Sequence, residues 1–162
     1  MPSSPSSYMV SRLPSEYQVL QLIHVIGATI WVGGHLLLLG GYLRRALREG
    51  SASPIIEFER MFARIGLPSF ALTMVSGALM GLIRYPPSLW LDLDGPTGRL
   101  GLKVLTVTAL LPIMVYAEKR VLPALKSGGN PKMLARFSVL ATVATILSLI
   151  LVVLGWAVRF GI

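Results

Sequence analysis

The chain contains no cysteine and only two histidines among its 162 residues. Without thiols it can form no disulfide, no thiolate metal site and no attached c-type haem, and it has no thiol nucleophile. The remaining histidines and carboxylates cannot supply a tetrahedral zinc site in one place. They also cannot form a serine, histidine and carboxylate set at one depth of the apolar runs, so hydrolytic catalysis has no support.

Acidic residues are scarce as well, with 7 Asp and Glu against 15 Lys and Arg, which gives a net charge of +8. In a soluble protein this balance would suggest nucleic acid as a partner. Here 54% of the residues are hydrophobic, the mean hydropathy is +0.70, and the basic residues cluster at the ends of apolar runs. We therefore expect an integral membrane protein that contacts the lipid bilayer and binds no nucleic acid.

Four apolar runs are long enough to cross about 30 Å of hydrocarbon at a rise of 1.5 Å per residue. They cover roughly residues 17–43, 65–84, 100–118 and 137–158, and no internal repeat is evident between them. Residues 1–16 are polar and rich in Pro and Ser, which predicts a flexible tail. The sequence thus predicts an all-α integral membrane protein with one domain, a four-transmembrane-helix bundle.

Charge asymmetry between the connections predicts the orientation of this bundle. Two of the connections carry ten basic residues between them: Arg44, Arg45, Arg48, Arg60, Arg64, Lys119, Arg120, Lys126, Lys132 and Arg136. The opposite side has four: Arg12, Arg84, Arg99 and Arg159. By the positive-inside rule we expect a multi-pass protein of the plasma (inner) membrane, with the basic loops cytoplasmic and the N and C termini outside.

Both histidines lie in the first predicted span, in the segment HVIGATIWVGGH. At 100° per residue His24, Trp31 and His35 share one face, and Gly27 and Gly34 lie beside it, where small residues admit another helix or a flat ligand. The histidines are about 16 Å apart along the axis, too far to ligate one metal ion. Since imidazole in a bilayer is costly without a partner, we favour a cofactor site over simple core packing.

Depth within the spans suggests partners for each histidine. Lys103 lies inside the third span, about 9 Å outside the midplane, at the level of His24. Met80 falls at the same outer level, and Met114 falls near the inner level of His35. The alternatives are that the lysine snorkels to the interface and that the methionines fill gaps in the core.

The segment LIHVIGATIWVGGHLLLL resembles the first helix of copper-resistance protein D-like (CopD-like) membrane domains, which opens with a histidine followed seven residues later by Trp and a small-residue pair. The segments GLPSFALTMVSGALMGLI and GLKVLTVTALLPIMVYAEKRVLPAL resemble spans of the HemJ-type membrane protoporphyrinogen oxidases. That second resemblance implies roles in haem b binding and activity for the matching residues His24 and Lys103. The sequence departs from it after Trp31, where His35 appears instead.

Our first hypothesis is a cytochrome b-like electron-transfer protein, an oxidoreductase that holds one or two haem b groups. His24 is the axial ligand of an outer haem, with Lys103 or Met80 as sixth ligand or close neighbour. His35 is a candidate ligand of an inner haem, with Met114 or a residue of another subunit as its partner. A quinone or another redox protein would exchange electrons with the pair.

The alternative is a copper-handling protein that passes Cu(I) between histidine and methionine pairs, as the CopD-like resemblance implies. Met74 and Met80 do not share a helix face, which weakens a continuous thioether path. A HemJ-like protoporphyrinogen oxidase and a structural subunit without cofactor are further alternatives. Under each of these hypotheses a homo-oligomer or a larger membrane complex is a possible assembly.

Overall fold

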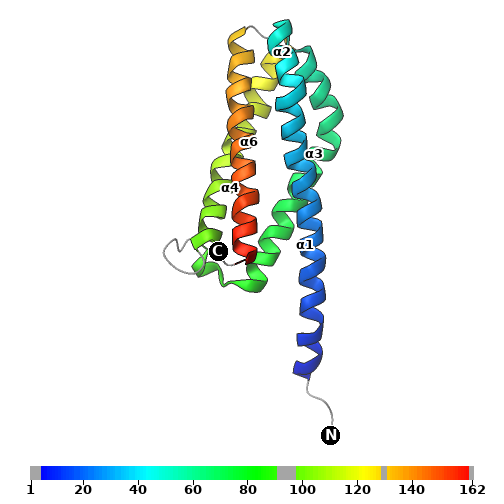
Figure 1. Cartoon of the computed structure of the whole chain (residues 1–162), viewed down its shortest axis with the longest axis vertical. Coiled ribbons are helices and arrows are strands. Elements are labelled where there is room, and N and C mark those ends of the chain that lie inside the picture. Colours follow the sequence, from blue (N-terminus) through cyan, green and yellow to red (C-terminus); the bar gives the residue numbers. More distant parts are fainter. Residues whose placement is uncertain (1–4, 91–97, 129–130, 161–162) are drawn as a thin grey trace.

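The computed structural model describes residues 5–90, 98–128 and 131–160, with side chains for 16–90, 98–128 and 131–159. Within these ranges every regular element is helical and no strand is present. The elements are α1 (Pro5–Leu37), the π-helix η1 (Leu38–Leu43), α2 (Arg44–Glu49), α3 (Ser53–Arg84), the 3-10 turn η2 (Pro87–Leu89), α4 (Gly98–Tyr116), the π-helix η3 (Ala117–Val121), α5 (Leu122–Lys126) and α6 (Pro131–Phe160) (Figure 1). The all-α prediction is confirmed.

Four helical stretches are long and apolar enough to cross a membrane: Glu16–Glu49, Ser53–Arg84, Gly98–Lys126 and Pro131–Arg159. They confirm the four-transmembrane-helix prediction and extend the predicted spans, because the helices continue through charged turns that hydropathy excludes. Pro54 lies in the first turn of α3 and Pro131 begins α6, positions where a fixed φ favours a helix start. The helix α1 begins at Pro5, inside the segment predicted as a flexible tail, of which residues 1–4 lie outside the described part.

The four long helices are arranged as two antiparallel hairpins. The first hairpin packs α1 against α3, the second packs α4 against α6, and the hairpins meet mainly along α1 and α6 (Figure 1). Among the described residues α3 and α4 share almost no contact. The short helices α2 and α5 gather at one end of the bundle, called here the basic end because the predicted basic loops lie there.

The two hairpins are structural repeats, which the sequence analysis did not find. Each consists of a long helix, a π-helix, a short helix, a turn and a second long helix, and η3 begins 79 residues after η1 (117 − 38). The same spacing relates three pairs of buried residues in one core cluster: Leu43 and Leu122, Ala46 and Leu125, Ile55 and Leu134. It also relates two buried serines, Ser69 and Ser148, and the histidines to other predicted site residues: His24 to Lys103 and His35 to Met114.

The core differs between the two ends of the bundle. At the basic end it is a cluster of aliphatic side chains from both hairpins. Towards the other end Leu110 and Ala144 are buried together with small, hydroxylated side chains: Ser69, Thr73, Ser76, Thr145 and Ser148. The Thr73 and Thr145 hydroxyls donate to carbonyls one turn earlier in their own helices. Such residues satisfy their polar groups locally and let helices approach closely in lipid.

Candidate functional site

The ring of His24 is held against α3 by its Nδ1 atom. Nδ1 lies 2.9 Å from the backbone oxygen of Thr73 and 3.3 Å from the hydroxyl of Ser76. A carbonyl oxygen only accepts, so Nδ1 carries the proton and donates to Thr73. The other ring nitrogen, Nε2, therefore keeps its lone pair in the neutral ring. This is the tautomer in which a histidine binds a metal through Nε2.

Two glycines make the close approach of α1 and α3 possible at this level. A Cβ atom at Gly77 would lie 2.8 Å from Cε1 of His24 and 3.1 Å from Nδ1, so the imidazole rests directly on the α3 backbone. A Cβ atom at Gly27 would lie 2.5 Å from the hydroxyl oxygen of Thr73 and 2.8 Å from the backbone oxygen of Ser69. Sequence reasoning selected Gly27 but missed Gly77. The available signal for Gly77 was its position, four residues after Thr73 in a segment with several small side chains.

Lys103 points across the bundle. Its Nζ lies 3.4 Å from the position of a Cβ atom at Gly155, so the side chain extends from the first turns of α4 to the last turns of α6. It therefore does not follow its own helix outward, as a snorkelling lysine would. Its ammonium is close enough for its charge to act on the ring of His24. Among the described residues no carboxylate forms an ion pair with it.

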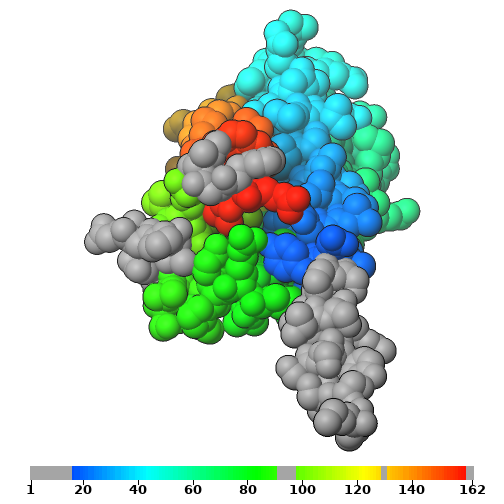
Figure 2. Space-filling view, turned by 60° about the horizontal axis from the view of Figure 1, so that its bottom comes forward, coloured from blue at the N-terminus to red at the C-terminus, as the bar shows by residue number. Residues whose placement is uncertain are grey.

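A contact between helix ends lies at the end of the bundle opposite the basic end. The guanidinium of Arg159, in the last turn of α6, donates to Gln21 of α1 at 2.8 Å, one turn outward from His24. Figure 2 looks onto this end of the molecule, where the segments of α1, α3 and α6 form one continuous surface. The level of His24 and Lys103 thus lies within the bundle, below a polar contact that joins the two hairpins.

Trp31 and His35 form a second arrangement, deeper in the bundle. His35 donates from Nδ1 to the backbone oxygen of Trp31 at 3.1 Å, so its Nε2 also keeps a lone pair. The two rings lie 4.4 Å apart between centroids, and Trp31 lies 4.7 Å from Phe70 of α3. The indole nitrogen donates to Ser148 of α6 at 3.3 Å. Trp31 therefore joins α1, α3 and α6 and supports the ring of His35.

The remaining predicted residues are not joined to the histidines in the structure. Gly34 packs against the ring of Phe62 on α3. Met80 is half-buried and follows Thr73 by seven residues, which places it on the face of α3 that meets α1. Met114 is half-buried on α4. Within the described ranges no hydrogen bond or ring contact links either methionine to a histidine, and no group of three histidine or carboxylate side chains gathers as a metal cluster.

The arrangement offers two imidazoles in the same tautomer, one level above the other on α1. Each has its Nδ1 proton fixed by a backbone carbonyl, which sets the ring orientation and raises the basicity of Nε2. A cation, Lys103, acts on the ring of His24, whereas the indole of Trp31 packs against the ring of His35. These are the donors of a site that takes one or two imidazole ligands, and they offer no nucleophile activated by a base and a carboxylate.

Comparison with known proteins gives one match. The family model of copper resistance protein D (CopD) matches residues 56–158, which include Thr73, Lys103 and Ser148 but not the two histidines of α1. Neither the curated proteins nor the solved structures gave a match. The match covers more than half of the chain and extends over three of the four long helices. This chain is therefore a multi-pass membrane protein that belongs to the copper resistance protein D family.

Proposed function

We propose that this protein handles copper within the membrane and that His24 binds Cu(I) through Nε2. The observation that carries the proposal is the hydrogen bond from Nδ1 of His24 to the backbone oxygen of Thr73. Histidines that ligate metals almost always donate their other ring proton in this way, because the bond fixes the tautomer and the ring orientation. The family of the chain supports copper as the metal.

The donor types fit a Cu(I) cargo. Cu(I) accepts imidazole and thioether ligands, and Met80 lies on the face of α3 that meets α1. His35 would be a second station, about 16 Å further along α1. Met114 is its equivalent in the other hairpin (114 − 35 = 79) and supplies a thioether on α4. Two stations of this kind would carry copper between the two sides of the bilayer.

A second candidate, haem b, is favoured by one observation. The ammonium of Lys103 extends from α4 to α6 with no carboxylate partner among the described residues, and an unpaired positive charge disfavours a bare copper ion nearby but would pair with a haem propionate. His24 would then be the axial ligand. Bound haem would supply one-electron chemistry, with a quinone or a redox protein as the electron partner.

Copper binding tests the proposal directly. The detergent-purified protein is titrated with Cu(I) in competition with a chromogenic Cu(I) chelator, as wild type, His24→Ala, His35→Ala and the control Thr29→Ala. Thr29 is exposed on the same helix and bonds only its own backbone, so its loss should leave copper binding unchanged. We expect the variant at His24 to lose one copper ion. Full copper binding by that variant would refute the assignment.

The visible spectrum of the same preparations decides the second candidate. A colourless wild-type protein excludes haem b as a bound group. A Soret band that gains sharp α and β bands on reduction with dithionite, and that disappears in His24→Ala, would establish haem at this ring and replace the copper proposal. Pyridine haemochrome quantification of the wild type and His35→Ala then counts one haem or two.

A further inference from the structure

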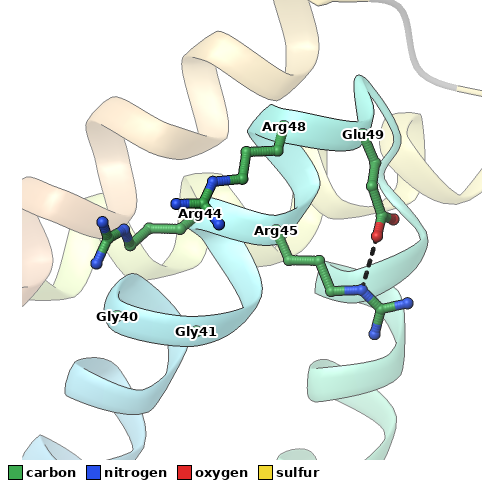
Figure 3. Close-up of a pocket in the computed structure, with 6 residues that line it drawn as sticks. All are labelled: Gly40, Gly41, Arg44, Arg45, Arg48 and Glu49. Atoms are coloured by element: carbon green, nitrogen blue, oxygen red, sulfur yellow. Dashed lines mark hydrogen bonds and ion pairs between the residues drawn. The ribbon is translucent and has the colours of Figure 1, made fainter.

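A cavity of about 350 Å³ lies at the basic end of the bundle, away from the histidines. It is formed at the end of the first span, where the π-helix η1 passes into α2 (Figure 3). Its lining is short and strongly basic: Gly40, Gly41, Arg44, Arg45, Arg48 and Glu49. Neither the family match nor the copper proposal uses any of these residues, since the match begins at residue 56.

Two glycines create the space. A Cβ atom at Gly40 or at Gly41 would meet no heavy atom within 4 Å, so both leave the helix surface open rather than serve close packing. The equivalent positions in the second hairpin hold Lys119 and Arg120 (40 + 79 and 41 + 79). Long side chains are therefore compatible with this place in the fold. In the first hairpin the glycines leave a recess there, at its π-helix.

The charges around the recess are divided between two sides of the helix. Arg45 donates to Glu49 at 2.8 Å and lies 3.7 Å from Glu57, so its charge is neutralised within the protein. Arg44 and Arg48 are four residues apart and point together to the other side (Figure 3). In the described part of the chain no carboxylate pairs with either of them. Two unpaired guanidinium groups therefore border the recess.

Guanidinium groups in such a pair match the oxygens of a phosphate group. Their fixed fork of donors forms bidentate hydrogen bonds with phosphate, and the bare backbone of Gly40 and Gly41 lets the ligand approach. Immediately before the recess the helix presents Leu36 and Leu37, which are 49% and 65% exposed. A ligand bound here can thus place an anionic group beside the arginines and an apolar part against the exposed leucines.

We propose that the recess at Gly40, Gly41, Arg44 and Arg48 binds the phosphate headgroup of an anionic phospholipid, whose acyl chains lie along the exposed leucines. Basic recesses at the ends of transmembrane helices are suited to such headgroups, which gain from each nearby Lys or Arg. The bound lipid fixes the end of α1, at the π-helix, relative to the membrane surface. A free phosphate ion would share the arginine contacts but gain nothing from the apolar surface.

Binding of phosphatidylglycerol to the purified full-length protein tests the proposal. Lipid adducts are counted by native mass spectrometry, with phosphatidylcholine as the neutral lipid and inorganic phosphate as the soluble anion. The variant Arg44→Ala/Arg48→Ala removes the two guanidinium groups, and Gly41→Leu fills the recess while keeping the charge. The control Lys119→Ala/Arg120→Ala removes two basic residues from the equivalent positions of the second hairpin.

We expect one phosphatidylglycerol molecule to remain bound to the wild type and to the control. The arginine variant should bind it roughly 30-fold more weakly, the effect of two surface cations. The variant Gly41→Leu should also lose it, because the leucine side chain fills the recess. Open space at this position lets this variant fold. Equal weakening in the control, or unchanged binding in both site variants, would overturn the proposal. So would competition by inorganic phosphate together with no preference for phosphatidylglycerol over phosphatidylcholine.

Discussion

The close contact of α1 with α3 at Gly27 gives the sharpest prediction about stability. In Gly27→Ala the added carbon lies 2.8 Å from the backbone oxygen of Ser69 and 2.5 Å from the hydroxyl of Thr73. Ordinary contact begins near 3.4 Å, so the helices must separate by roughly 0.6 Å to relieve the first contact (3.4 − 2.8) and 0.9 Å to relieve the second (3.4 − 2.5). The hydroxyl cannot simply turn away, because it is held in its own hydrogen bond to Ser69 at 2.8 Å.

The expected cost combines two effects. Overpacking of a well-packed helix contact costs about 1–3 kcal/mol. Separation of the helices also weakens the bond from His24 to Thr73, which contributes about 0.5–1.5 kcal/mol. We therefore expect Gly27→Ala to lower the free energy of unfolding by about 2–4 kcal/mol relative to a glycine substitution that meets no neighbour.

The chain offers that matched substitution at Gly33, on the same helix. A Cβ atom there meets nothing within 4 Å, so Gly33→Ala gains the same helix propensity without a clash. Both variants are unfolded in mixed micelles by titration with sodium dodecyl sulfate, and helix content is followed by far-ultraviolet circular dichroism. Unfolding free energies that agree within about 0.5 kcal/mol would refute the reasoning.

Two further predictions concern the hairpin junction and the charge beside the outer histidine. Trp31→Phe should lower the free energy of unfolding by about 1–3 kcal/mol, since it loses ring volume and the bond to Ser148. In a double-mutant cycle with Ser148→Ala, strictly additive losses would contradict the bond. Lys103→Met should tighten Cu(I) binding at His24, because it removes a neighbouring positive charge that opposes the binding of a cation. If the ligand is haem b the same variant should weaken binding, and unchanged affinity for either ligand would contradict the electrostatic contact.

The sequence predicted the four crossings because hydropathy and helix length are local properties. It underestimated the helix lengths for the same reason. The start of α3 and the end of the third crossing carry charges, as in the turn with Glu57 and Glu59 and in η3, and local hydropathy excludes such turns. Their helicity comes from packing at the basic end, where Ile55, Val121 and Leu134 are buried together. The orientation of the bundle stays a prediction from charge.

The internal repeat was not found in the sequence because the two hairpins share the positions of their π-helices and buried side chains, whereas most of the residue types at those positions differ. His24 corresponds to Lys103 and His35 to Met114, and these pairs are too different chemically for a sequence comparison to align them. What the hairpins share is the place of their π-helices and of their buried side chains. These features become visible only when both hairpins are folded, and they explain why the depth of Lys103 matches that of His24.

The sequence by itself determined that His24, Trp31 and His35 share a face of one helix and that the two imidazoles cannot share an ion, because both follow from the helical repeat and rise. Only the tertiary structure decided the state of the His24 ring. The carbonyl that fixes the tautomer of His24 belongs to Thr73 on α3, and the cation that acts on it comes from α4. Those partners lie far away in the chain, and only helix packing, made possible by small residues at the contacts, brings them to the ring.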